Sequence, residues 1–373
     1  MIVSLVKEPS SCILLVMIKI TITNDILNLL LRIEANRTRF SGIHVPLSLG
    51  NKLRKNSQKK SSFASNKIEG NPLSYEQVEE VIDAHRHLLS PEQEIKNYFL
   101  ALLLIEEKLA KKELVSLGLI LEIQKMVVFG SSKEKIGLRG PMPAGILFAV
   151  YDEKTGNPDY IPPESKDVLP LLNELVTYLG VSDDHPIIKA AVAHYQLVTI
   201  HPFEDGNGRT ARLLSDYVLS CYGYDFGNFG SLEEYFAFDV DEYYRSLQMG
   251  LPAPYYDGRN DPPHPEIWAM YFLRMMELYS SKIVSSVTRE TLKTGEASLS
   301  YLSRKEKDFL SHILKHNIEK FKPIELVKPL KKSARTIANY SASLAKNGFL
   351  KPNLVKTRIT SYSIKDLAKE IKL

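Results

Sequence analysis

The stretch HPFEDGNGRTAR, residues 201–212, places one histidine, two carboxylates, two glycines, one asparagine and two arginines within twelve positions. It directly follows the apolar run AAVAHYQLVTI (190–200), whose spacing predicts a helix. The same spacing in RTARLLSDYVLSCYG (209–223) predicts a second helix. The centre of the predicted fold is therefore a pair of helices joined by a polar, glycine-rich loop.

The segment DGNGR (205–209) predicts an anion-binding site. Gly206 and Gly208 allow positive φ, so that successive backbone N–H groups can point into one concavity. The following helix adds its unpaired N-terminal N–H groups and the positive end of its dipole. Arg209 and Arg212 lie three residues apart on one helix face, and two guanidiniums suit a polyphosphate. We therefore expect the phosphates of a nucleotide to bind here.

Two further residues of the loop indicate a reaction. Asp205 would be repelled by phosphate unless a cation lies between them, and Mg²⁺ is the usual cation in that position. His201 lies at the end of the preceding helix, where an imidazole can take a proton from an attacking hydroxyl. The set predicts phosphoryl or nucleotidyl transfer. For each of these residues taken alone, the alternative interpretation is a solvent-exposed loop in front of a capped helix.

The whole stretch resembles the motif HPFx[DE]GN[GK]RxxR of the Fic (filamentation induced by cAMP) family at every specified position. The resemblance implies a mainly α-helical core with a β-hairpin flap, which transfers AMP from ATP to a hydroxyl group of a target protein. It implies that His201 is the general base and that Asp205 holds Mg²⁺. It implies that the phosphates are held by Gly206, Asn207, Gly208, Arg209 and Arg212. Tyr243 and Tyr244 would stack on the adenine, with helix packing as the equally open alternative for both.

The segment GILFAVYDEKTGNPDYIPP (145–163) interrupts the helical pattern. Its two short β-prone runs surround a turn-rich centre, which predicts a β-hairpin closed by Pro162 and Pro163. It resembles the Fic flap, which clamps the target's backbone by adding a strand.

The segment SNKIEG (65–70) resembles the Fic inhibitory motif [S/T]xxxE[G/N], with Ser65, Glu69 and Gly70 in place. A helical segment that brought Glu69 to Arg212 would pair its carboxylate with the guanidinium intended for the γ-phosphate. ATP would then bind with its phosphates misplaced, so the enzyme would inhibit itself within one chain. An exposed glutamate on a polar helix is the alternative. A further alternative is an enzyme that mainly removes AMP from a modified protein.

We expect three domains: an N-terminal helical region with the inhibitory helix (1–95), a Fic catalytic domain (96–290) and a winged-helix domain (291–373). Three predicted helices followed by the alternating run VKTRITSYSI (355–364) indicate the winged helix-turn-helix. Residues 303–373 contain 17 Lys and Arg against 6 Asp and Glu, a net charge of +11, so residues 1–302 sum to −7 within the chain's total of +4. This charge favours DNA as a partner. The candidate recognition helix presents Arg335, Thr336, Asn339 and Tyr340, although many winged helices join proteins instead.

A nucleotide-sensing, DNA-binding transcriptional regulator is the competing function. The intact His201 argues against it, because a sensor needs no base. Gly208, where the phosphorylating branch of the family carries lysine, favours nucleotidyl transfer. Self-modification and a homodimer are both open.

The composition supports a cytoplasmic protein with no membrane contact. The chain has two cysteines without metal-ligand spacing and no apolar run of 18 residues. The apolar run 12–18 is interpreted as a buried strand or as a start codon placed before the true one at Met17. We further expect His194 and Trp268 in the core and the basic run Lys52 to Lys60 in a solvated loop.

Overall fold

The computed structural model describes residues 17–43, 45–131, 135–146, 148–151, 156, 158–252, 259, 261–294, 302–347, 349–355 and 358–364. Two compact units share the chain. The first takes Met1–Glu34 and Arg54–Tyr279, and the second takes Ala35–Leu53 and Ser280–Leu373. Met17 and Ile18 are buried, but the rest of the apolar run 12–18 lies outside the described residues.

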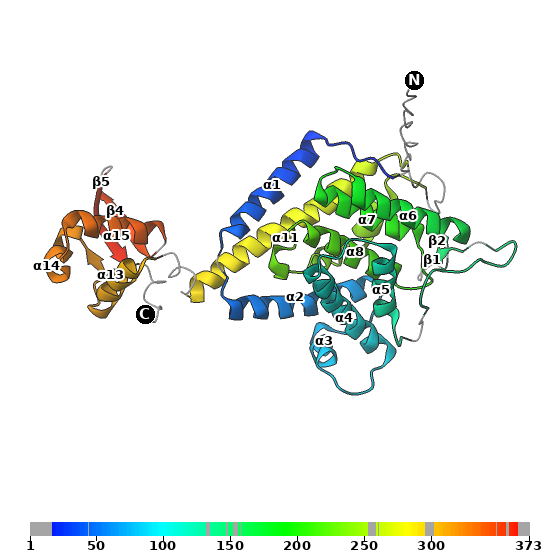
Figure 1. Cartoon of the computed structure of the whole chain (residues 1–373), viewed down its shortest axis with the longest axis horizontal. Coiled ribbons are helices and arrows are strands. Elements are labelled where there is room, and N and C mark those ends of the chain that lie inside the picture. The colour runs from blue at the N-terminus through cyan, green and yellow to red at the C-terminus, as the bar shows by residue number, and fades with distance from the viewer. Residues whose placement is uncertain are drawn as a thin grey trace, which may run out of the picture. The chain divides into compact units, whose positions relative to one another are not determined.

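The structure is mainly helical. The chain up to the hairpin forms α1 (Asn24–Ser41), α2 (Leu47–Ile68), α3 (Tyr75–Ile82), α4 (Ser90–Ala110) and α5 (Leu117–Val128) (Figure 1). After the hairpin come α6 (Ser165–Val181), α7 (Pro186–Ile200), α8 (Asn207–Cys221), the 3-10 turn η1 (Phe226–Asn228), α9 (Glu233–Phe236), α10 (Val240–Gln248) and α11 (Pro265–Thr294). Within the described part of the chain, no helix is both long and apolar enough to span a membrane.

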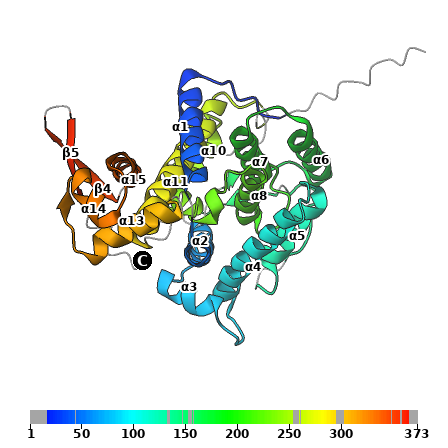
Figure 2. The same ribbon diagram turned by 60° about the vertical axis from the view of Figure 1, so that its left-hand side comes forward.

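The centre of the first unit is the pair α7 and α8. Pro186 occupies the first turn of α7, where a missing N–H costs nothing, and nearly every α7 side chain is buried. α8 packs along α7, and α4 and α5 cover α8 (Figure 2). The loop between α7 and α8 is therefore held between two core helices, so its backbone has a defined position.

The predicted hairpin is present as β1 (Val150–Tyr151) and β2 (Pro158–Tyr160), which pair antiparallel. Its turn at 152–155 lies outside the described residues. Tyr160 is buried and donates a hydrogen bond to the Thr199 carbonyl near the end of α7. This bond and the buried Pro162 and Pro163 attach the second strand to the core.

The prediction of a solvated loop from Lys52 to Lys60 is wrong, because α2 spans this segment. The helix has no apolar stripe to reveal it. Several of its buried side chains are polar: Ser57 donates to the Gly230 carbonyl at 2.7 Å, and Ser61 donates to Glu233 Oε2 at 2.8 Å. Lys59 and Lys60 pair at 3.0 Å with Glu79 and Glu234 respectively. Hydrogen bonds and ion pairs therefore hold this helix in addition to the hydrophobic contacts of Phe63, Ala64 and Ile68.

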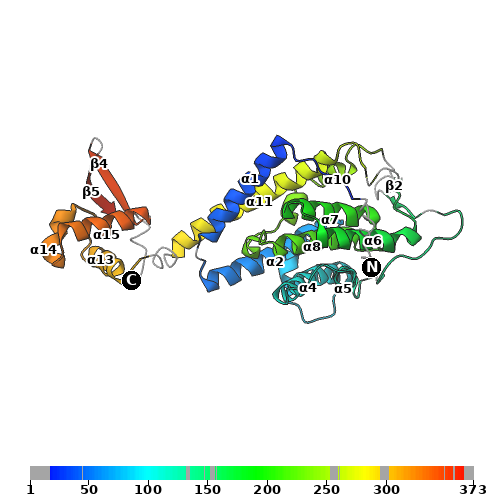
Figure 3. The same ribbon diagram turned by 45° about the horizontal axis from the view of Figure 1, so that its top comes forward.

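The tail of the chain forms α13 (Arg304–Lys315), β3 (Lys320–Phe321), the 3-10 turn η2 (Pro323–Leu326), α14 (Val327–Leu330), α15 (Ala334–Lys346), β4 (Leu350–Val355) and β5 (Arg358–Ile364) (Figure 3). The helices predicted at 303–316 and 333–350 are present as α13 and α15, and the helix predicted at 322–330 is a 3-10 turn followed by the short α14. The strands β3 and β4 were not predicted. The strands form an antiparallel sheet in the order β3-β5-β4. Assignment as a winged helix stays a prediction.

These elements enclose a hydrophobic core of their own. Its buried members are Leu302, Phe309, Leu310, Ile313, Phe321, Leu326, Ile337, Leu344, Phe349, Leu350 and Tyr362. Ser303 and Glu306 form a capping box at the start of α13. The tail therefore has the contacts needed to fold without the rest of the chain.

A fragment of residues 301–373 should unfold cooperatively on heating. Replacing the fully buried Leu344 by alanine should reduce its free energy of unfolding by about 2 to 5 kcal/mol. The matched Leu354→Ala, at a side chain that is 61% exposed, should change it by less than about 0.5 kcal/mol. Circular dichroism melts measure both. A fragment without a cooperative transition would contradict an independent core.

Candidate active site

His201 directly follows α7 and has left-handed backbone angles, φ 48° and ψ 57°. Its N–H donates to the Leu197 carbonyl at 3.1 Å, and its carbonyl accepts from Arg139 Nε at 2.8 Å. The ring Nδ1 lies 3.3 Å from the Val198 carbonyl. A carbonyl only accepts, so Nδ1 carries the proton and Nε2 of the neutral ring is left as the basic nitrogen.

The surroundings keep this ring neutral. Burial lowers the pKa of His201 to about 4, and the charge of Arg139 acts in the same direction. The bond to Val198 and the carboxylates of Glu69 and Asp205 raise the pKa but do not outweigh these causes. At neutral pH the imidazole can therefore accept a proton.

The loop after His201 is closed by Asn207. Its Oδ1 accepts from the Phe203 N–H, and its Nδ2 donates to the Phe203 carbonyl, both at 2.9 Å. The side chain thus binds the loop itself, so any phosphate contact falls to the backbone. Gly206 has φ +84°, and a Cβ there would lie 3.0 Å from Val128. Gly208 lies within α8, so the expectation of positive φ at both glycines is wrong for Gly208.

The start of α8 has the geometry of an anion site. The first intrahelical bond runs from the Thr210 N–H to the Gly206 carbonyl, at 2.9 Å. The N–H groups of residues 207–209 precede it and have no acceptor within the helix. Gln124, buried on α5, steadies the approach: its Nε2 donates to the Asp205 carbonyl at 3.2 Å, and its Oε1 accepts from the Gly137 N–H at 3.1 Å.

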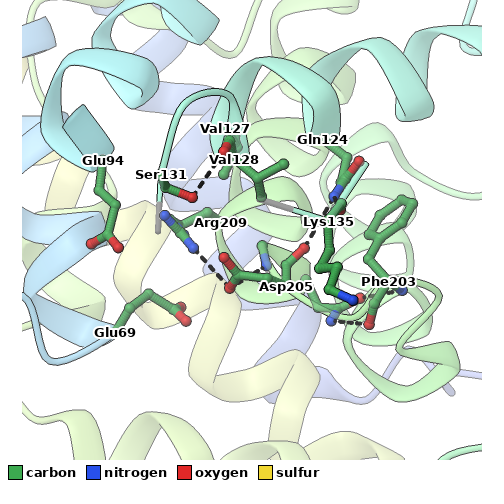
Figure 4. A network of polar contacts seen from close by, with 12 residues as sticks. Glu69, Glu94, Gln124, Val127, Val128, Ser131, Lys135, Phe203, Asp205 and Arg209 are labelled. Carbon is green, nitrogen blue, oxygen red and sulfur yellow. Dashed lines mark hydrogen bonds and ion pairs between the residues drawn. The ribbon is translucent and has the colours of Figure 1, made fainter. Parts of the chain in front are cut away.

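Asp205 and Arg209 form an ion pair at 3.0 Å (Figure 4). The same carboxylate oxygen, Oδ1, accepts from the Gly206 N–H at 2.7 Å. Arg209 is 3% exposed, and its Nε and Nη1 are buried without a hydrogen-bond partner. Buried, unsatisfied guanidinium groups indicate that an anion belongs here.

Arg212 is bound to the segment that contains Ser65 and Glu69. Its Nη2 donates to Glu69 Oε1 at 2.6 Å and to the Ser65 carbonyl at 3.0 Å, and its Nε donates to Ser65 Oγ at 2.7 Å. A Cβ on Gly208 would lie 2.5 Å from Glu69 Oε1, so a side chain at this position would displace the carboxylate. Gly70, with φ +79°, turns the chain away just after Glu69. The structure therefore places Ser65 and Glu69 of the predicted inhibitory motif against Arg212 of α8.

Glu69 is held as an anion. Burial raises the pKa of its carboxyl, but the charges of Arg212 and Arg209 and the hydrogen bond from Arg212 outweigh burial, so the net pKa lies below the ordinary value. Glu69 therefore places a stable negative charge beside the guanidiniums of Arg209 and Arg212.

Tyr243 and Tyr244 are placed differently. Tyr243 is 1% exposed, its hydroxyl lies 2.8 Å from His194 Nε2, and its ring stacks on Phe236. The packing alternative therefore holds for Tyr243, and its ring faces cannot take an adenine. Tyr244 is 46% exposed, and its ring centroid lies 5.0 Å from that of Tyr243.

The core predictions for His194 and Trp268 are confirmed, since both are fully buried.

Two residues that bond to the backbone of the loop, Arg139 and Gln124, were not predicted from the sequence. They lie 62 and 81 residues from the backbone atoms that they bind in the loop, and neither lies in a recognisable motif.

The chain is similar to several known proteins. Residues 114–219 match the model of the Fic/DOC family. The protein adenylyltransferase Fic of Drosophila willistoni is 30% identical over 199 residues, which are 52% of this chain and 38% of the relative. That of Drosophila virilis is 31% identical over 202 residues, 52% of this chain and 39% of the relative. The chain thus spans about two fifths of the curated relatives that it matches.

Solved structures share the fold. A Fic family protein from Desulfovibrio desulfuricans G20 covers 94% of this chain and 98% of its own, with 20% identity and a TM-score of 0.59. A Fic-1 fragment from C. elegans covers 71% of this chain and 72% of its own, with 22% identity and a TM-score of 0.53. The chain therefore contains a Fic domain in a mainly helical Fic fold.

The His201 ring should titrate near pH 4, with the neutral form present throughout the range above pH 5. An NMR titration of ring-labelled protein measures this, and the His201→Ala variant identifies the resonance by its loss. A midpoint near the ordinary value of 6.5 would contradict the argument that burial sets the protonation state.

Proposed function

We propose that this chain, whose residues 114–219 form a Fic domain, is a self-inhibited protein adenylyltransferase that moves AMP from ATP to a hydroxyl group of a target protein. One observation carries the proposal. A neutral imidazole with a basic Nε2 lies four residues from an anion site that contains two buried guanidiniums. Curated relatives named protein adenylyltransferase add support.

In the proposed reaction, the α-phosphate binds at the N–H groups that begin α8, where the positive helix end favours negative charge. Arg209 and Arg212 hold the β- and γ-phosphates. The target's hydroxyl oxygen bonds to the α-phosphorus, and the bond to the bridging oxygen breaks. Pyrophosphate leaves with that electron pair, and His201 Nε2 takes the hydroxyl proton. AMP becomes an ester of the target.

The loop suits Mg²⁺ as an ion brought by the nucleotide. No cluster of three or more possible protein ligands exists among the described residues, so Asp205 would act as a single carboxylate ligand and phosphate oxygens would supply others. The two hydrogen bonds to the Asp205 carboxylate described above both use Oδ1, which leaves Oδ2 as the candidate ligand atom. Bound there, the ion would neutralise phosphate charge next to the carboxylate.

Self-inhibition follows from the same atoms. Glu69 holds the Nη2 of Arg212 at 2.6 Å, and Arg212 is the residue assigned to the γ-phosphate. A phosphate and a carboxylate cannot share this nitrogen without repulsion. We propose that ATP binds to the inhibited protein with its terminal phosphate displaced.

The tail supports a second activity, binding to DNA. It carries the charge of +11, and Arg335 and Asn339 are exposed on α15, the candidate recognition helix.

We propose the domain limits 1–95, 96–290 and 291–373 for these functions. We also propose a cytoplasmic location, which the supply of ATP and the two cysteines support.

The transferase is tested with α-labelled ATP and Mg²⁺, using wild type, Glu69→Gly and Glu69→Gly/His201→Ala. Incorporation into the protein itself and into cell-lysate proteins should rise at least about tenfold in Glu69→Gly, because Arg212 is released to the phosphates. It should fall by about 10² to 10⁴ in the double variant, which lacks the base.

Equal labelling by wild type and Glu69→Gly would contradict self-inhibition but keep the transferase. Loss of AMP from pre-labelled protein by wild type alone would favour AMP removal as the main activity. Absence of label in all three proteins, with ATP still bound, would overturn the proposed transfer.

Binding of the full chain to duplex DNA should weaken linearly on a log–log salt scale. Arg335→Ala should weaken binding and reduce the salt slope by about one if Arg335 contacts a phosphate. The control Arg304→Ala removes the same charge from the exposed start of α13. Fluorescence anisotropy measures both, and equal effects of the two substitutions would contradict α15 as the recognition helix.

A further inference from the structure

Arg139 lies outside every motif, in the segment between α5 and the hairpin, yet it is 5% exposed. Its backbone N–H donates to the Pro202 carbonyl at 2.9 Å. The neighbouring Leu138 forms an antiparallel bridge with Phe203. The segment therefore runs beside the first residues of the loop and places the Arg139 side chain at His201.

The guanidinium of Arg139 joins parts of the site that are far apart in sequence. Its Nε donates to the His201 carbonyl at 2.8 Å, and its Nη2 donates to the Ile200 carbonyl at 3.5 Å and, more closely, to the Pro163 carbonyl. Its plane lies over the Phe148 ring, 4.9 Å from the centroid. Pro163 and Phe148 flank the hairpin on its two sides, so one group contacts both ends of the hairpin and the end of α7.

His201 needs such support. A φ of +48° is uncommon for a residue with a Cβ, and it persists only where surrounding contacts hold it. The Phe148 ring also lies 6.1 Å from the His201 ring. Arg139 thus holds the carbonyl of His201, and Phe148 lies beside its imidazole.

We propose that Arg139 is a positioning residue that couples the β1–β2 hairpin to His201, so that a target segment docked on the hairpin is aligned with the base. The inference rests on the proposed transferase. Arginine suits the task because its rigid fork presents several donors in one plane, whereas a lysine ammonium cannot bond these carbonyls and cover the ring together. None of the Arg139 contacts described above involves the two arginines assigned to phosphate.

Because these contacts do not include the two arginines assigned to phosphate, the effect of Arg139 on the base can be tested separately from ATP binding. In the Glu69→Gly background, Arg139→Met should lower kcat for AMP incorporation by about 10 to 100-fold, as expected when a base is misaligned. Affinity for ATP, measured by calorimetry, should stay within about twofold because the phosphate site is untouched. Arg139→Lys should recover only part of the rate. The control Lys135→Met removes a charge from the same segment at an exposed ion pair with Glu204, and should behave as Glu69→Gly.

A rate for Arg139→Met equal to that of Glu69→Gly would overturn the proposal. A parallel loss of ATP affinity would also overturn it, since it would show general damage to the fold. The NMR signals of the labelled His201 ring are read in the same proteins. They should move in Arg139→Met and stay in place in Lys135→Met.

This last measurement needs no transfer activity. If Glu69→Gly fails to incorporate AMP, the proposed function fails, and the ring signals still decide whether Arg139 orients His201. Unchanged signals in Arg139→Met would overturn the positioning role in either case.

Discussion

The pairing of Arg212 is the interaction on which the site depends. A guanidinium cannot lose its proton under ordinary conditions, and this one is 2% exposed, so it must have an anion or strong acceptors beside it. Ser65 supplies a hydroxyl and a carbonyl, and Glu69 supplies the charge. A polyphosphate could supply the same charge. Glu69 and the nucleotide therefore compete for the same nitrogen atoms of Arg212. Inhibition follows because this buried cation must be paired with an anion.

The placement of Ser65 and Glu69 depends in turn on the polar contacts of α2. Glu233 accepts hydrogen bonds from Tyr98, Ser61 and Ser231, which fastens the helix one turn before Ser65. The helix ends at Ile68, and Gly70 has a positive φ directly after Glu69. Because Ser61 bonds to Glu233 and not to Glu69, removal of the Glu69 carboxylate leaves this contact of the helix in place. The inhibitory contact can thus be released without detaching α2.

Much of the site could be predicted because its chemistry is contiguous. Residues 201–212 lie in one loop and one helix turn, so spacing alone placed the base, the anion site and both arginines together. Sequence periodicity failed for α2, because many of its buried side chains are hydroxyl and amide groups. It also could not show that Tyr243 is enclosed by aromatic rings, or that Asn207 would bind its own loop. The role of Arg139 could not be predicted from the sequence, because the residues that it contacts lie at the end of α7 and on both sides of the hairpin.

The central claim is that Glu69 withholds Arg212 from the terminal phosphate. Calorimetric titration of AMP, ADP and ATP with Mg²⁺ into wild type and Glu69→Gly tests it most directly. The account predicts that wild type binds ATP little better than ADP. It predicts that Glu69→Gly prefers ATP over ADP by about tenfold, one charge-assisted contact of about 1.4 kcal/mol, while its affinity for AMP is unchanged. An ATP-to-ADP ratio that is the same in both proteins would contradict the claim.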